Sequence, residues 1–184
     1  PGESGFFFEI SKGAVCAGNV FVNCESGIHI LNSCDVRMYQ NTLVNSTACI
    51  SRNERSAVGD HFGWHPATGP DVDERDGHLF VNNLMTGNDG FNRPLLLVSQ
   101  RKMLCDRLKE PKLTQVDHNV YVQNPAGRTM PLIVWSPAAN DNCIAALDSP
   151  AALNKLHPEF AAHSLFFTEG SVYKICELGN FHML

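Results

Sequence analysis

The feature that most constrains the fold of this chain is an internal repeat with a period near 22 residues. Residues 15–23 align with residues 36–45, and Asn19 and Asn41 occupy equivalent positions at an offset of 22 residues. Weaker copies of the same pattern follow at residues 79–85 and 116–124. A period of this length is typical of stacked units, because one unit cannot bury its apolar side without a neighbour.

Each period is predicted to form two or three short strands, with the next period stacked above it at a strand spacing of about 4.8 Å. Asparagine suits the corners, because it tolerates left-handed backbone and because stacked asparagines can bond one another. A β-sandwich is the alternative, but its hairpins need Asn-Gly or Asp-Gly turns, which are largely absent from the repeats. The side chains that we expect to point inward are Val20, Val22, Ile28, Ile30, Val36, Met38, Leu43 and Ile50.

Composition narrows the class of protein. The 184 residues suit a single domain, and a net charge of -5 without a basic stripe makes nucleic acid a poor candidate partner. No apolar run reaches the length of about eighteen residues that a membrane span needs.

The seven cysteines include no CxxC pair, so we expect small buried hydrophobic residues rather than a zinc site or a disulfide. A chain that begins at Pro1 is expected to be part of a longer solenoid.

Residues 6–46 resemble the right-handed parallel β-helix repeats of the pectate-lyase-like superfamily, in which asparagine-bounded strands recur in this way. Residues 131–137, 157–160 and 177–181 are similar to the closing region of bacterial secreted β-helix proteins that degrade polysaccharides. The resemblance implies an all-β solenoid in a secreted or periplasmic bacterial protein. It also implies a polysaccharide or oligosaccharide partner, and further coils of a longer β-helix chain. It is specific for the fold and weak for the reaction, because one scaffold carries many activities.

Departures from the period predict loops on one face of a solenoid, often the binding face. The longest, residues 51–78, is the segment richest in reactive side chains. A shorter polar turn covers residues 88–94, and a helical turn is expected near residues 103–108. Near the end, Ser149 and Pro150 are typical of a helix start, and we expect a helix through residue 156 that packs Leu153 and Leu156.

Two kinds of polysaccharide cleavage fit the residues of the 51–78 loop. A glycoside hydrolase needs two carboxyl groups, one protonated and one ionised. A lyase neutralises a uronate, often with arginine or calcium, and removes a proton with a basic side chain. The catalytic candidates are Asp60, Asp73, Glu74 and Asp76. The substrate-binding candidates are Arg52, Arg55, His61, Trp64, His65, Arg75 and His78.

Each of these residues also has a structural interpretation. The charges of residues 73–76 alternate in sign, as in a solvated turn whose charges pair with one another. His61 and His65 lack the glutamate of the zinc-protease motif, and Trp64 is either a sugar platform or a plug over the last coil. No metal site is predicted. Calcium is left open because Asp71, Asp73 and Asp76 are spaced like the ligands of calcium loops, although the glycine and the terminal glutamate of the EF-hand pattern are absent.

Two classes of function therefore stay open. The first is an enzyme that cleaves an extracellular polysaccharide, as a glycoside hydrolase or a lyase. The second is a non-catalytic carbohydrate-binding, adhesive or structural β-helix. An enzyme should bring at least two titratable groups together in a groove, whereas a stalk should leave such groups scattered and solvated.

Overall fold

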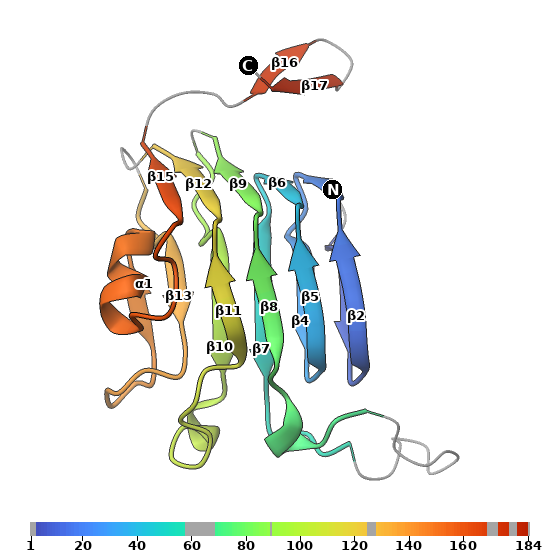
Figure 1. Ribbon diagram of the computed structural model, residues 1–184, viewed down its shortest axis with the longest axis vertical. Coiled ribbons are helices and arrows are strands. Elements are labelled where there is room, and N and C mark those ends of the chain that lie inside the picture. Colours follow the sequence, from blue (N-terminus) through green and yellow to red (C-terminus); the bar gives the residue numbers. More distant parts are fainter. Residues whose placement is uncertain are drawn as a thin grey trace.

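The computed structural model describes residues 3–57, 69–88, 90–124 and 128–168, together with the backbone of two strands near the C-terminus. The described part of the chain is mostly β, with three largely parallel sheets and one short α-helix (Figure 1). The prediction of an all-β chain with a short helix near its C-terminal end is confirmed. No helix among the described residues has the length and apolarity that a membrane crossing requires.

Three sheets carry the fold. The back sheet contains β1 (Ser4–Glu9), β4 (Ser26–Leu31), β7 (Thr47–Arg52), β10 (Leu96–Gln100), β13 (Ile133–Trp135) and β14 (Ala145–Leu147). The front sheet contains β2 (Lys12–Ala17), β5 (Cys34–Tyr39), β8 (His78–Val81) and β11 (Leu113–Asp117). The upper sheet contains β3 (Val20–Val22), β6 (Thr42–Val44), β9 (Leu84–Gly87), β12 (Val120–Gln123) and β15 (Leu165–Phe167).

Shorter elements complete the structure. Two 3-10 helices, η1 (Val72–Glu74) and η2 (Lys102–Leu104), lie in the connections, and η2 confirms the helical turn expected there. The helix α1 covers Pro150–Leu156. Strands β16 (Tyr173–Cys176) and β17 (Asn180–Met183) pair with each other in antiparallel orientation.

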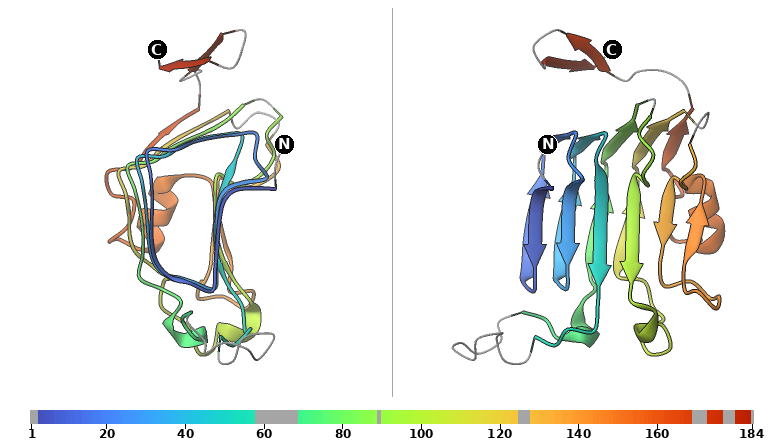
Figure 2. Two further views of the ribbon diagram at one scale, coloured as in Figure 1. Left: turned by 90° about the vertical axis from the view of Figure 1, so that its right-hand side faces the viewer. Right: turned by 180° about the vertical axis from the view of Figure 1, so that it is seen from behind.

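The chain visits the three sheets in turn. Strands β1, β2 and β3 lie in the back, front and upper sheets, and each pairs in parallel with the strand three places further along, β4, β5 and β6. Val20 pairs with Thr42, the same offset of 22 that the sequence repeat shows. Viewed along the row of strands, successive turns of the chain overlay one another (Figure 2, left).

Asparagines stack along one corner, as the repeat predicts. The Oδ1 atom of Asn41 accepts bonds from the backbone N and the Nδ2 of Asn19, both at 3.1 Å. Asn83 receives the same pair of bonds from Asn41, at 3.0 and 3.1 Å. Asn119 receives them from Asn83, and its own backbone N–H donates to Ser164 Oγ at 3.1 Å. Left-handed backbone also occurs at corner asparagines, namely Asn23, Asn32, Asn45 and Asn82.

The core lies between the sheets and confirms most of the inward positions. Six of the predicted side chains are fully buried: Ile28, Ile30, Val36, Met38, Leu43 and Ile50. The prediction for β3 is wrong, because Val20 is 60% exposed and Phe21 packs against the core instead. In a strand of three residues, a shift of one position exchanges the inner and outer faces.

The C-terminal end of the stack is covered by α1 and the segment after it. Ser149 caps the helix by accepting a bond from Ala152 N at 3.2 Å, as predicted. Leu153 is buried in the core, whereas Leu156 is 39% exposed, so its predicted packing is wrong. Next to the helix, β14 pairs with β13 in antiparallel orientation, which ends the parallel order of the back sheet.

The expectation of no disulfide is wrong. Cys105 and Cys143, which follow η2 and precede β14, form a disulfide across 38 residues of sequence. Neither cysteine belongs to the repeats, so the period carries no signal for their pairing. Cys16, Cys34 and Cys49 are unpaired and buried, which agrees with their prediction as small hydrophobic residues.

Candidate functional site

The predicted site residues fall into two groups. Asp60, His61, Trp64 and His65 lie outside the described residues, and nothing is inferred about their positions. The others lie on β7, on β8 and on the segment between them that contains η1. Most of these described residues contact other parts of the fold rather than one another.

Arg52 lies at the end of β7 and is only 3% exposed. Its Nε donates to Gln100 Oε1 at 2.8 Å, and its guanidinium reaches the carbonyls of Leu108 and Glu110 at 3.3 Å. Burial lowers its pKa to about 10. These contacts join β7 to the connection after β10, so this arginine is not available to a substrate.

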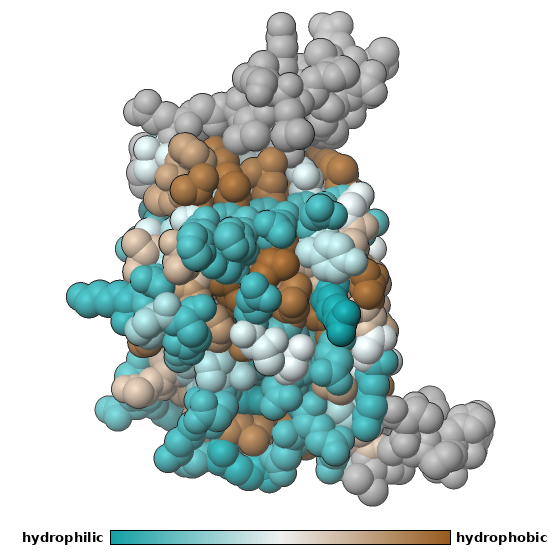
Figure 3. All heavy atoms as spheres, viewed as in Figure 1, coloured by the Kyte–Doolittle hydropathy of each residue, from teal (hydrophilic) through white to brown (hydrophobic). Residues whose placement is uncertain are grey.

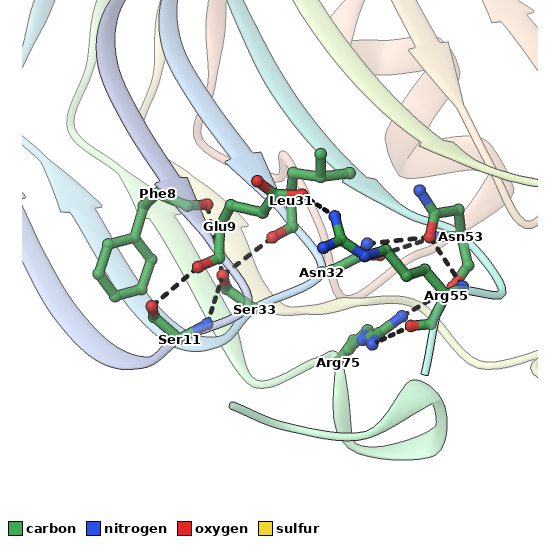
Figure 4. A network of polar contacts seen from close by, with 9 residues as sticks. All are labelled: Phe8, Glu9, Ser11, Leu31, Asn32, Ser33, Asn53, Arg55 and Arg75. Atoms are coloured by element: carbon green, nitrogen blue, oxygen red, sulfur yellow. Dashed lines mark hydrogen bonds and ion pairs between the residues drawn. The ribbon is translucent and has the colours of Figure 1, made fainter. Parts of the chain in front are cut away.

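Arg75 and Arg55 anchor the two ends of the predicted loop (Figure 4). Arg75 is 1% exposed and donates to the carbonyls of Pro70, Asn53 and Arg55. Arg55 pairs at the surface with Glu9, 3.2 Å away. The buried guanidinium therefore holds the backbone of residues 53–55 against the segment before η1.

The acidic residues of η1 pair with other parts of the chain. Asp73 Oδ1 lies 2.9 Å from Arg107, and Glu74 Oε2 lies 3.6 Å from Lys12; both carboxylates are more than half exposed. Glu74 also accepts a bond from Asp71 N at 3.2 Å. The partners lie near η2 and on β2. The sequence interpretation had these charges pairing with one another within the turn, whereas in the structure they pair with other segments.

His78 begins β8 and is 2% exposed. Its Nδ1 accepts a bond from Val36 N at 3.3 Å, which requires that nitrogen to be unprotonated. Burial, together with the nearby charge of Lys112, lowers its pKa to about 4. Such a histidine is neutral at physiological pH and serves the packing of β8 on β5.

A groove lies on the outer face of the front sheet, beside the predicted loop. It has a volume of about 520 Å³ and is lined by Gly13, Ala14, Val15, Asp35, Arg37 and Gly77. Gly13, Asp35 and Gly77 have positive φ angles of 67°, 55° and 77°, and they lie side by side at the start of successive strands. Since glycine has no side chain, the flank of Asp35 at Gly13 is open, whereas the space over Gly77 is filled by the Asp35 carboxyl group itself.

One predicted catalytic residue, Asp76, lies next to this groove in the chain. Asp76 directly precedes the lining residue Gly77, and its backbone carbonyl accepts a bond from Asp35 N at 3.0 Å. Burial raises the pKa of Asp76; the charge of Arg52 opposes this rise, and the charge of Asp35 adds to it. Asp76 was among the predicted catalytic residues, whereas Asp35 was not. The only sequence signal for Asp35 was its place at a repeat corner.

Basic and apolar side chains flank Asp35 at the groove. Arg37 lines the groove, and its strand neighbours on the outer face are Val15 on β2 and Leu79 on β8. Figure 3 shows this face, with apolar side chains along its upper rim and in smaller patches near its centre, among mostly polar ones. The face thus offers both charged groups and apolar surface to a sugar ring, whose faces are themselves apolar.

A second cluster of titratable groups was missed by the sequence analysis. Asp117, His118 and His163 place one potential ligand atom each within 4.8 Å of the others. They lie at the end of β11 and just before β15, 46 residues apart in sequence. No local pattern joins residues at that separation, so only the stacking of the chain brings them together.

No family model, curated protein sequence or solved structure matches the chain. Function is therefore inferred from the geometry and chemistry of its own residues. Among the described residues, the groove at Asp35 adjoins a predicted catalytic residue, Asp76, whose pKa is raised in part by the charge of Asp35.

Proposed function

We propose that the chain is a stretch of right-handed parallel β-helix that cleaves an extracellular polysaccharide. The scaffold is supported by the three parallel sheets, which the chain visits in a fixed order, and by the asparagine stack at one corner. Right-handedness is favoured because nearly all crossovers between parallel strands of one sheet have this hand.

The observation that carries the activity is the groove at Asp35, beside which the backbone carbonyl of Asp76 accepts a bond from Asp35 N and the charge of Asp35 contributes to the raised pKa of Asp76. Hydrolysis of a glycosidic bond needs one protonated carboxyl group and one ionised carboxylate. A raised pKa at Asp76 suits the acid, and Asp35, which lines the groove, is proposed as the second carboxyl group. Two carboxyl groups whose environments differ are the usual basis for such a division of roles.

The reaction follows from these roles. Asp76 gives its proton to the glycosidic oxygen as the bond from that oxygen to the anomeric carbon breaks. Asp35 accepts a proton from a water molecule, whose oxygen bonds to the anomeric carbon. Exchange with solvent then returns a proton to Asp76 and removes one from Asp35. Arg37 is placed to bind a hydroxyl or carboxylate group of the sugar chain.

A secreted or periplasmic location accompanies this proposal. The disulfide between Cys105 and Cys143 supports it, because disulfides persist in oxidising compartments and are rare in the cytosol. An extracellular polysaccharide is a substrate that such a protein would meet. The open groove on a sheet face also suits a polymer better than a small molecule, which usually binds in an enclosed pocket.

Non-catalytic carbohydrate binding is the second candidate. Three predicted site residues favour it. Arg52, Arg75 and His78 are buried and form hydrogen bonds with other residues of the fold, so they do not contact a substrate. In this case Arg37 and the apolar outer face would bind the sugar chain, and the carboxyl groups would accept bonds from its hydroxyls.

The test is an assay of the full chain on a polysaccharide panel, with and without calcium. Release of reducing ends reports hydrolysis, and absorbance of unsaturated uronates reports a lyase. We expect hydrolysis that Asp76→Asn and Asp35→Asn each lower by about 10²-fold or more. The control is Asp148→Asn, which removes a carboxylate that is 82% exposed and remote in sequence from the groove. Binding of a sugar without cleavage would favour the second candidate, and neither binding nor cleavage would remove both.

A further inference from the structure

The cluster at the end of β11 has the composition of a metal site. It lies at the opposite edge of the front sheet from β2, which lines the groove, so it is separate from the proposed catalytic pair. Asp117 ends β11, His118 follows it with a positive φ of 56°, and His163 approaches from the segment before β15. The three side chains offer two imidazole nitrogens and one carboxylate.

The carboxylate of Asp117 is held in place from one side. Its Oδ1 accepts bonds from the backbone N–H groups of His118 and His163, both at 2.8 Å, and a longer one of 3.5 Å from Ser164 Oγ. The side chain is 12% exposed, so these bonds fix its orientation with the other carboxylate oxygen left toward the rings.

The other carboxylate oxygen faces both rings. Oδ2 of Asp117 lies 2.7 Å from Nδ1 of His163 and 3.8 Å from Nε2 of His118. The two imidazole rings stack with centroids 4.8 Å apart. The side chains of His118 and His163 are 51% and 68% exposed, so an ion can reach these atoms from solvent.

The backbone fixes the two segments against each other. Ala161 N donates to Val116 O at 2.6 Å, and Leu165 N donates to Asn119 O at 2.9 Å. These bonds lie on either side of the cluster, so the separation of Asp117 and His163 is set by the fold rather than by the side chains alone. Such support is what a metal site requires of the residues behind its ligands.

We propose that Asp117, His118 and His163 bind one divalent transition-metal ion of the zinc type. Two imidazoles and one carboxylate suit zinc, nickel or copper, whereas calcium and magnesium require a shell of oxygen ligands. Water fills the remaining positions, because the cluster faces solvent. The backbone bonds to Oδ1 are the outer shell that orients the carboxylate.

Binding requires a small rearrangement of the rings. Their planes lie within 9° of each other, and a metal ion lies close to the plane of each imidazole that binds it. One ring must therefore turn out of the stack when the ion enters. Both side chains are half exposed or more, so this rotation displaces little packing.

The experiment is calorimetric titration of zinc chloride into the full chain without a histidine tag, repeated with cobalt and visible spectroscopy. We expect one site, with the affinity lowered at least tenfold in His163→Ala, His118→Ala and Asp117→Asn. Asparagine at position 117 still accepts the backbone bonds, so this variant separates loss of a ligand from loss of the fold. Unchanged far-UV spectra and unfolding midpoints in the absence of metal confirm that the variants are folded.

Two controls decide whether the ion binds here. His29→Gln removes a histidine of β4 that packs on Phe7, and the double variant His61→Gln, His65→Gln removes the pair in the loop. Neither should change the affinity. Zinc binding that survives all three cluster variants, or that is lost with the loop pair, would overturn the proposal, and so would an absence of binding.

Discussion

Asn41 receives two hydrogen bonds from Asn19 at one oxygen atom, from the backbone N–H and from the side-chain amide of the same residue, each at 3.1 Å. Its own amide N–H groups donate to Asn83 and to the carbonyl of Cys16. Each inner asparagine of the stack thus satisfies polar groups of neighbouring turns that water does not reach.

Removing an inner asparagine should therefore destabilise the fold. Asn83 is 1% exposed and bonds Asn41, Asn119 and the carbonyl of Met38. We expect Asn83→Ala to lower the free energy of unfolding by about 2–4 kcal/mol, since it leaves buried groups unsatisfied. Asn19→Ala, at the exposed end of the stack, should cost less. Urea unfolding of both variants checks this, and equal losses would contradict a role for burial.

The row of left-handed residues at the groove gives a matched pair of glycine variants. Gly13 and Gly77 both have positive φ, but only at Gly77 would an added Cβ lie 2.5 Å from Asp35 Oδ1. We expect Gly13→Ala to cost about 1 kcal/mol of unfolding free energy from its backbone alone. Gly77→Ala should cost more than this, because the Asp35 carboxyl group must also rotate away from the added methyl group. Chemical unfolding measures both, and similar values would argue against the contact with Asp35.

His78 predicts a pH dependence of stability. Its pKa is about 4 in the folded chain and near 6.5 when unfolded, so the unfolded state binds the proton more tightly. The contribution of His78 to the free energy of unfolding should therefore be fully present above pH 6.5. It should fall by about 3 kcal/mol as the pH drops toward 4. His78→Gln should flatten the profile in that window. Unfolding midpoints measured from pH 4 to 7 test this, and parallel profiles for both proteins would refute it.

The disulfide should matter for stability under oxidising conditions. Cys143→Ser opens a loop of 38 residues and should lower the free energy of unfolding by about 2–4 kcal/mol. A reducing agent should have the same effect on the unaltered chain and none on the variant. Thermal melts provide the measurement, with Cys24→Ser, which removes an unpaired thiol, as the control. A peptide map without the 105–143 link would contradict the pairing.

The repeats made the regular part of the fold predictable. The asparagine offset of 22 matches the observed pairing of β3 with β6, and alternation placed the core side chains of β4 and β5 correctly. The alternation was misassigned at Val20, because a strand of only three residues does not show which of its faces points inward. In β3 the inward residue is Phe21. Helix α1 was predictable because Ser149 and Pro150 form a local start signal.

The candidate sites were less predictable than the fold. The many charged residues of the 51–78 loop made it the predicted site. Arg52 and Arg75 are nevertheless buried there as structural residues, and their sequence context does not reveal this burial. Asp76 was found there, but its partner Asp35 lies on β5, and pairing between turns brings the two together. Asp117 and His163 are further apart still. Contacts between turns depend on the length of every intervening loop, which no local pattern encodes.

The antiparallel pairing of β14 with β13 has a consequence for polymerisation. A copy stacked in the same orientation on the β14 edge would have to pair with it in antiparallel order, because β14 runs against the other strands of the back sheet. The parallel ladder of the described back sheet therefore cannot be extended unchanged from this edge.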